Sequence, residues 1–305
     1  MYDLSRILIC LDLSEVDDQL IKAASSVGNH LHGKKFFFLH IVESFDLPTE
    51  IEEKYPNLLA PVDENVKHII EDKIQKNFKN HEDFEYEIEI KEGNTTDIIL
   101  KQSQAHEIDL LIMGKKLKDQ GSGMLPEKIV KLCHCSFLLV PYNSYEGLKR
   151  ILVPLDFSKS SKMALEQAMH ISKISGASIT CQHGYKVPSG YHSTGKTYAE
   201  FAEIMRANAM KDFQYFLKSM GLGKDEFPCI YSLVNGENSA HAIHSTAVKE
   251  EMDLIVMGSK GRTGLASILM GSVAMKTVKY DLEVELLVVK DKKENMGFLQ
   301  ALLNL

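Results

Sequence analysis

The sequence predicts an α/β protein built from two tandem doubly wound domains, each a five-stranded parallel sheet with helices on both faces. Three observations predict this fold. The 305 residues are enough for two domains of ordinary size, each with its own core. Short apolar runs alternate with longer amphipathic runs, which is typical of parallel βαβ units. The second half of the chain also repeats the first, which indicates a duplicated domain.

The repeat has a fixed period. RILICLDLSE begins at residue 6 and matches RILVPLDFSK at residue 150, while EIDLLIMGK at residue 107 matches EMDLIVMGS at residue 251. Both offsets are 144 residues, since 150 − 6 and 251 − 107 give the same difference. We therefore expect a first domain over 1–142 and a second over 148–290, with a short polar linker between them. The tail, 291–305, is charged and then apolar, and we expect an amphipathic helix that docks within the oligomer.

Five strands are expected in each half, in the order in which the apolar runs occur. In the first half these runs are 7–12, 36–42, 86–91, 109–114 and 136–141. In the second half they are 151–156, 177–183, 229–234, 253–257 and 284–289. The runs between them carry helix signals: SKMALEQAMHISKISG starts with Ser, has apolar residues at helical spacing and closes with Gly176. Such a sheet binds ligands beyond the carboxyl ends of its strands, where the strand order reverses.

Composition and charge narrow the class of protein. Hydrophobic residues make up 44% and charged residues 25% of the chain, as in a water-soluble globular protein. No apolar run is long enough to cross a bilayer and the amino terminus lacks a signal-peptide pattern, so we expect a cytoplasmic protein. The net charge of −7 argues against binding to nucleic acid or to an anionic membrane, because both need a cationic face.

No metal site is expected. Cys133, His134 and Cys135 form the one local cluster among the five cysteines, and no second cluster completes a set of four zinc ligands. His241 and His244 are spaced to share a helix face, but no third ligand is in register. We expect the cysteines to pack in the core as small hydrophobic residues.

The most informative stretch follows the strand expected at 253–257. The chain reads GSKGRTGLASILMGS from Gly258 to Ser272, a G-x2-G-x9-G-S pattern. A strand that ends in Gly and a helix that opens after Gly-Ser bring bare backbone N–H groups and a hydroxyl together, which is how proteins hold phosphate. Lys260 and Arg262 add positive charge to this loop. The pattern favours nucleotide binding, although glycines can also serve only to turn the chain.

Other residues converge on the same edge of the sheet, because Asp156 ends the first strand of the second half and His183 and Gly184 end the second. With these motifs the chain resembles the universal stress protein family in its tandem form, over nearly its whole length. The resemblance implies an adenine nucleotide over the strand ends, ATP or another adenylate, with or without Mg²⁺. Carried over residue by residue, it implies Pro154, Leu155 and Asp156 beside adenine and ribose, His183 and Gly184 on the base side, and Met257, Gly258, Gly261, Gly271, Ser272 and Val273 around ribose and phosphates. Lys260 and Arg262 join them through charge alone.

The first half departs from this pattern. Asp12 is kept, but Leu117 stands where the second glycine of the loop is expected. From the glycine that ends the fourth strand to the valine that ends the fifth, the first half has 26 steps (140 − 114) and the second 31 (289 − 258). A shorter loop with a bulky Leu offers fewer free N–H groups, so we expect weak nucleotide binding or none. Lysines in this loop, Lys115, Lys116 and Lys118, can attract phosphate by charge, but such a loop is more often simply solvated.

A second motif competes for the phosphate. GYHSTGKT, residues 190–197, fits the P-loop pattern G-x4-G-K-T, in which Lys and Thr serve phosphate and magnesium. A true P-loop needs a strand that runs straight into its first glycine, whereas here Pro188 and other residues intervene. We instead expect a mobile segment over the crevice, from which Lys196 or His192 can reach a phosphate.

The resemblance implies a cytoplasmic, nucleotide-binding regulatory protein of the stress response. No residue of the loop is an obvious general base, so we expect no catalytic residues and at most slow ATP hydrolysis. Family members pair through the edge of the last strand, which implies an intramolecular pseudo-dimer joining 136–141 and 284–289, and a homodimer of whole chains is also compatible. Two alternatives stay open: a magnesium-dependent P-loop ATPase or phosphotransferase that uses 190–197, and a scaffold that binds no nucleotide.

Overall fold

The chain divides into two compact units, Asp3–Tyr142 and Asn143–Leu305. The structure is a computed structural model and describes residues 4–31, 33–42, 54, 62–115, 125–142, 147–234, 239–262, 270–280 and 283–296. The expected tail helix beyond residue 296 and most of the linker lie outside these residues. Each unit is an α/β domain, as the sequence predicts.

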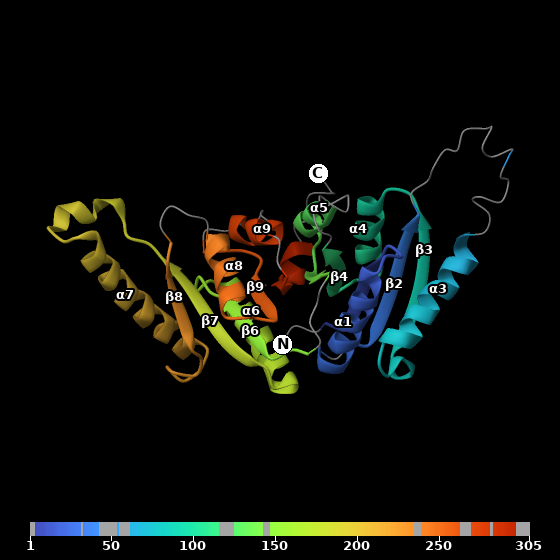
Figure 1. The fold of residues 1–305 in the computed structure, drawn as a ribbon, viewed down its shortest axis with the longest axis horizontal. Helices are drawn as coiled ribbons and strands as arrows, with labels where there is room; N and C mark the ends of the chain where they lie inside the picture. The colour runs from blue at the N-terminus through green and yellow to red at the C-terminus, as the bar shows by residue number, and fades with distance from the viewer. Residues whose placement is uncertain are drawn as a thin grey trace. The chain divides into compact units, whose positions relative to one another are not determined.

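The first unit contains five parallel strands in the order β3-β2-β1-β4-β5 (Figure 1). Because parallel strands connect through right-handed crossovers, the reversal of strand order after β3 sends the helices before and after it to opposite faces. Accordingly, α1 contacts α3, and α4 contacts α5. The elements are β1 (Arg6–Leu11), α1 (Val16–Leu31), β2 (Lys35–Val42), α3 (Val62–Asn77), η1 (His81–Asp83), β3 (Glu85–Glu92), α4 (Thr95–Ala105), β4 (Leu110–Lys115), α5 (Leu125–Leu132) and β5 (Ser136–Pro141).

The second unit repeats this order as β8-β7-β6-β9-β10, again with parallel strands. The order reverses between β6 and β9, as it does between β1 and β4, and α8 contacts α9. The predicted five-stranded parallel sheet in each half is confirmed. The elements are β6 (Arg150–Pro154), α6 (Lys159–Ser175), β7 (Ser178–Tyr185), η3 (Ser189–Thr194), α7 (Tyr198–Ser219), β8 (Cys229–Leu233), α8 (Ser239–Lys249), β9 (Leu254–Gly258), α9 (Ser272–Lys279) and β10 (Glu285–Val289).

The duplication extends to backbone details. Leu13 and Phe157 have φ values of 64° and 65°, and Glu107 and Glu251 have φ values of 51° and 49°. Each pair is 144 residues apart (157 − 13 and 251 − 107). Residues other than glycine rarely adopt this left-handed conformation, so its recurrence at equivalent positions shows that the two units build these turns alike.

Each core lies between the sheet and its helices. Phe36, Phe37 and Phe38 of β2 are all almost fully buried, although successive residues of a strand point to opposite faces. Burial on both faces is characteristic of parallel sheets covered by helices. Helix α6 has both predicted end signals: the Ser158 side chain accepts a hydrogen bond from the first turn, and Gly176 closes the helix with φ 75°. The Ser158 cap fixes the start of α6 against the turn after β6.

The five cysteines are free thiols, and Cys133, Cys135 and Cys181 are buried as predicted, whereas Cys10 and Cys229 are partly exposed. Burial raises the pKa of Cys229 to about 12, so this thiol is protonated at neutral pH. Within the described residues, no group of three or more Cys, His, Asp or Glu side chains is arranged to hold a metal ion. None of the described helices is long and apolar enough to span a membrane.

Candidate functional site

The turn after β6 and the loop after β9 meet at the carboxyl edge of the second sheet. The backbone N–H of Arg262 donates to Oδ2 of Asp156 at 2.9 Å, across 106 residues of sequence. The N–H of Ser259 donates to the carbonyl of Val289 at 3.0 Å, which ties the same loop to the end of β10. The convergence of Asp156 with the glycine-rich loop is therefore present.

The central strands of this sheet stop pairing before that edge. Register pairs between β6 and β9 end at Leu152 and Ile255, whereas in the first unit β1 and β4 pair as far as Cys10 and Met113. Pro154 is the counterpart of Cys10 at an offset of 144. Proline has no N–H to donate to a strand ladder. Pro154 thus accounts for the earlier end of pairing, at the switch point where α/β sheets bind ligands.

The carboxylate of Asp156 organises the turn after β6. Its Oδ1 accepts hydrogen bonds from the Ser161 hydroxyl at 2.6 Å and the Ser158 N–H at 3.1 Å, and its Oδ2 accepts the bond from Arg262. Burial acts to raise the pKa of Asp156, but the hydrogen bonds from Ser158, Ser161 and Arg262 outweigh it and hold the pKa below its ordinary value. A carboxylate offers about four acceptor positions. Oδ2 therefore keeps capacity for a further donor.

An aromatic stack lies beside this turn. The Phe157 ring stacks on His183, with ring centroids 4.2 Å apart and planes at 20°. Nδ1 of His183 lies 2.8 Å from the carbonyl oxygen of Leu155, and because a carbonyl only accepts, Nδ1 carries the hydrogen. Burial lowers the pKa of His183. The ring is thus neutral at pH 7, and its Nε2 is an acceptor.

The other residues predicted along this edge divide into buried and exposed ones. Leu155 and Met257 are each 4% exposed, so both belong to the core. Leu155 acts through its backbone, since its N–H donates to the carbonyl of Gln182 at 2.8 Å. Gly184 is exposed, and a Cβ there would lie 2.9 Å from the Val234 side chain. Contacts of these residues with a nucleotide stay a prediction.

Two glycines of the loop have different neighbours. A Cβ on Gly258 would lie 2.6 Å from the backbone of Ser160, and one on Gly114 in the first unit would come within 2.9 Å of α1. Both glycines let a helix pack closely against the fourth strand. A Cβ on Gly261 would instead lie 2.9 Å from Oδ2 of Asp156. Packing alone explains Gly258, whereas Gly261 allows the loop to approach the carboxylate.

Helix α9 begins at Ser272, with Gly271 as its N-cap residue and no hydrogen bond from a capping side chain. First-turn N–H groups have no acceptor within their own helix, so the amides of Ser272 and Val273, both exposed, point toward a position suited to an anion. The N–H of Gly271 donates to the carbonyl of Ser259 at 2.7 Å. The amide of Gly271 is therefore not one of the bare N–H groups expected in this loop.

The two cations of the loop have different surroundings. The Lys260 side chain is 11% exposed, and its Nζ lies 2.8 Å from Oε1 of Glu294. Arg262 is exposed, and its guanidinium lies 6.0 Å from the centre of the Phe157 ring. Sequence reasoning missed Glu294, because nothing in the spacing of the chain relates it to Lys260. It also missed the bond from Ser161, although the Ser-rich start of α6 was a usable signal.

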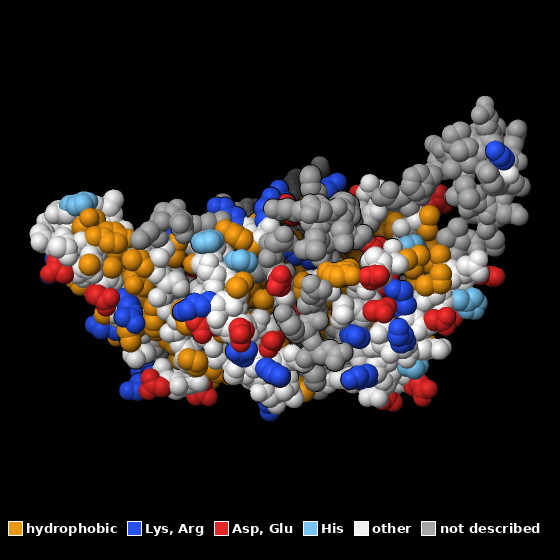
Figure 2. Space-filling view, viewed as in Figure 1, with side chains coloured by type: hydrophobic (Ala, Val, Ile, Leu, Met, Phe, Trp, Pro, Cys, Tyr) orange, Lys and Arg blue, Asp and Glu red, His pale blue; other side chains and the backbone are white. Residues whose placement is uncertain are grey.

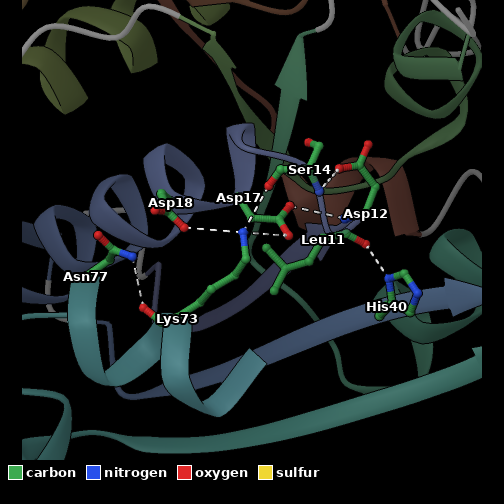
Figure 3. A network of polar contacts seen from close by, with 8 residues as sticks. All are labelled: Leu11, Asp12, Ser14, Asp17, Asp18, His40, Lys73 and Asn77. Carbon is green, nitrogen blue, oxygen red and sulfur yellow. Dashed lines mark hydrogen bonds and ion pairs between the residues drawn. The ribbon is translucent and has the colours of Figure 1, made fainter. Parts of the chain in front are cut away.

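The first unit keeps this turn but has charged side chains packed against it (Figure 3). Oδ1 of Asp12 accepts the Ser14 N–H at 3.1 Å, as Asp156 does with Ser158. At the counterpart of Ser161 stands Asp17, which is fully buried. Its Oδ1 accepts the N–H of Asp12 at 3.1 Å. A carboxylate thus replaces the hydroxyl of the second unit.

Lys73 of α3 reaches into the first-unit turn and compensates that carboxylate. Its Nζ donates to the carbonyl of Ser14 at 2.9 Å and to Oδ1 of Asp18 at 3.3 Å, and lies 3.7 Å from Oδ2 of Asp17 (Figure 3). His40 repeats the scaffold of the second unit, with Nδ1 3.1 Å from the carbonyl oxygen of Leu11. Of the lysines expected in the first-unit loop, Lys115 is the last residue of β4, whereas Lys116 and Lys118 lie in 116–124, outside the described residues.

Residues 190–197 do not form a P-loop. Ser189–Thr194 is a 3-10 helix followed by Gly195 with φ 71°. Thr197 caps α7 in a capping box with Glu200. Figure 1 places η3 at the outer end of the unit, away from α9. The P-loop interpretation does not fit this arrangement, and a role of Lys196 or His192 toward a phosphate stays a prediction.

Helix α7 is also notable for exposed apolar side chains. Figure 2 shows hydrophobic side chains interspersed with charged ones along this helix. The large exposed ones are Tyr198, Ile204, Met210 and Tyr215.

Comparisons with known proteins agree with the duplicated architecture. The profile of the universal stress protein family matches residues 4–141 and again residues 147–290. The chain belongs to the universal stress protein family. A universal stress protein of Methanocaldococcus jannaschii is 32% identical over 149 residues, which are 48% of this chain and 85% of that protein.

Solved structures extend the likeness of this universal stress protein to nearly its whole length. A universal stress protein of Archaeoglobus fulgidus is 18% identical, with a TM-score of 0.61 over 95% of this chain and 99% of its own. A functionally unknown protein of Pseudomonas aeruginosa is 14% identical, with a TM-score of 0.63 over 99% of this chain and 98% of its own. These likenesses show the shared fold, so the ligand has to be argued from the site.

Proposed function

We propose that this tandem universal stress protein binds an adenine nucleotide, ATP or a related adenylate, in its second domain and acts as a cytoplasmic regulator of the stress response. One observation carries the proposal: the hydrogen bond from Arg262 to Asp156 holds the glycine loop against the turn after β6. Gly271 adjoins this loop, since a Cβ there would lie 3.5 Å from Cα of Lys260. An acceptor suited to a sugar hydroxyl and a helix N-terminus suited to phosphate are thus brought together.

Each group has a role in this proposal. Oδ2 of Asp156 accepts a ribose hydroxyl, because it is the carboxylate oxygen with capacity left. The base lies beside Pro154, where the strand ladder ends, with the neutral ring of His183 nearby. The amides of Ser272 and Val273, with the Ser272 hydroxyl, face the phosphate chain.

We infer regulation through binding rather than catalysis. The Asp156 carboxylate accepts a hydrogen bond from the loop, and its hydrogen bonds hold its pKa below the ordinary value. Such a group is a weak general base at neutral pH. The nucleotide therefore acts as a ligand that stabilises the bound form of the domain by mass action, with at most slow hydrolysis.

Calorimetric titration of ATP into the full-length chain tests the proposal with two matched glycine variants. We expect saturable binding, and a loss of affinity of roughly tenfold or more in Gly261→Val, because the new side chain pushes the loop away from Asp156. Gly190→Val serves as the control, since a Cβ at Gly190 meets no atom within 4 Å. No saturable binding at millimolar ATP would leave a scaffold as the better interpretation. Retained affinity in Gly261→Val with loss in Gly190→Val would favour a role for 190–197.

A further inference from the structure

The lysine of the glycine loop is already paired with an anion from the same chain. Nζ of Lys260 lies 2.8 Å from Oε1 of Glu294, and the two side chains are 11% and 38% exposed. A hydrogen bond between two charged groups is roughly twice as strong as one between neutral groups. The small exposure of Lys260 also reduces screening by water and salt. This contact therefore differs from an ordinary surface ion pair.

The fold explains why Glu294 lies next to this loop. Strands β9 and β10 are neighbours with Val289 opposite Gly258, so the segments that follow them leave the sheet side by side. Directly after β10, Oδ1 of Asp291 accepts the N–H of Glu294 at 3.2 Å, and the carbonyl of Asp291 accepts the N–H of Asn295 at 3.0 Å. Asp291 thus starts a helical turn that presents Glu294 to the loop after β9.

A second lysine converges on the same carboxylates. Nζ of Lys159, the first residue of α6, lies 3.0 Å from Oδ2 of Asp291 and 3.8 Å from Oε2 of Glu294. Burial acts to raise the pKa of Asp291, but hydrogen bonds from Lys159 and from the N–H of Glu294 outweigh it, and the pKa lies below its ordinary value. The Asp291 carboxylate is therefore charged at neutral pH. Two cations, one at the start of α6 and one in the loop after β9, are held by two anions that follow β10.

Carboxylate and phosphate oxygens bind a lysine ammonium in the same way, so a carboxylate already paired with the ammonium weakens its attraction for phosphate and also repels the phosphate. Lys260 lies between Gly258 and Gly261, and its Cα is close to Gly271, which places it within the proposed phosphate loop. We infer that Glu294 competes with a phosphate group of the bound nucleotide for Lys260, and so sets the affinity of the site according to the phosphates that the ligand carries. This inference rests on the proposed function for the identity of the ligand.

Calorimetry on the full-length chain tests the competition with four probes: ATP, AMP, adenosine and inorganic tripolyphosphate. In Glu294→Gln, which removes the competing charge, we expect ATP and tripolyphosphate to bind roughly fivefold more tightly or better. Adenosine, which has no phosphate, should bind with unchanged affinity. Glu250→Gln is the matched control, because it removes the same charge at the end of α8, on the opposite edge of the sheet.

The outcomes separate this inference from the proposed function. Unchanged or weaker binding of ATP and tripolyphosphate in Glu294→Gln overturns the competition. An equal gain in Glu250→Gln also overturns it, since net charge alone would then explain the effect. If tripolyphosphate responds to Glu294→Gln but neither ATP nor adenosine binds better than tripolyphosphate, the competition holds and the adenine-nucleotide function fails.

Discussion

Asp12 and Asp156 occupy equivalent positions and hold the N–H two residues further on at the same distance of 3.1 Å. They differ in the neighbouring group, which is the Ser161 hydroxyl beside Asp156 and the Asp17 carboxylate beside Asp12. A buried carboxylate is costly unless a cation or hydrogen bonds compensate it. Lys73 supplies that cation from α3. The replacement of serine by aspartate at this position therefore connects the first-domain turn to α3 through an ion pair.

The first prediction concerns Asp17. Burial raises its pKa from 3.8 to about 6, against the opposing effects of the Asp12 N–H and of Lys73. Because the folded pKa lies above the unfolded one, the folded state binds the extra proton, and this contribution to stability is present at low pH and lost as pH rises through 6. Asp17→Asn should therefore raise the unfolding free energy above pH 6, by up to roughly 3 kcal/mol.

Thermal unfolding at several pH values between 4 and 8 checks this expectation. The difference in melting temperature between Asp17→Asn and the parent chain should grow as pH rises through 6. Asp18→Asn removes the same charge from a side chain that is 34% exposed, and it should show no comparable growth. A difference that is constant with pH would mean that the Asp17 carboxylate does not titrate in this range.

At the residue scale, the sequence predicted which groups meet but not how each is used. Asp156, Gly261 and Arg262 were identified from position and spacing, and they converge. The Gly271 amide, however, is engaged with Ser259, because whether an amide is bare depends on the path of the loop. The partner of Lys260 was out of reach for the same reason, since ion pairs between separate loops depend on tertiary structure.

At the scale of elements, α7 explains what the P-loop letters do in this chain. Thr197 accepts the N–H of Glu200, and the Glu200 carboxylate accepts the N–H of Thr197, so the Lys-Thr pair of the motif marks a helix start. Thr197→Ala removes this cap and should destabilise the chain by about 1 kcal/mol while ATP affinity is unchanged. Urea unfolding and ATP titration of the same preparation measure both quantities. A loss of ATP affinity without a loss of stability would restore the phosphate role of the motif.

Most other elements were predictable because their signals are local. Alternation of apolar runs placed all ten strands, and the Ser and Gly signals placed α6 between Ser158 and Gly176. A P-loop also requires a strand that leads directly into its first glycine. Pro188 and the 3-10 helix that follows it show that this requirement is not met, and Pro188 was visible in the sequence.

For the whole molecule, the duplication predicted two domains of the same fold. The structure shows that the carboxyl edges of their two sheets carry different residues. The equivalent histidines, the left-handed residues after each first strand and the packing glycines are shared, and these serve the scaffold. Pro154 and Ser161 have no like counterpart in the first domain, where Cys10 and Asp17 stand instead. We therefore expect differences at the edge, rather than differences in fold, to decide which domain binds nucleotide.

This difference between the two edges predicts that each chain binds one nucleotide. Asp156→Asn should weaken ATP binding roughly tenfold or more, because it removes a charged acceptor for the ribose and loosens the bond to the loop. Asp12→Asn makes the same change at the equivalent position and should leave affinity and stoichiometry unchanged, since the first-domain turn is held by Asp17 and Lys73. Calorimetry gives both quantities in one titration. A stoichiometry of two, or equal losses in the two variants, would show that the first domain binds nucleotide despite its internal ion pair.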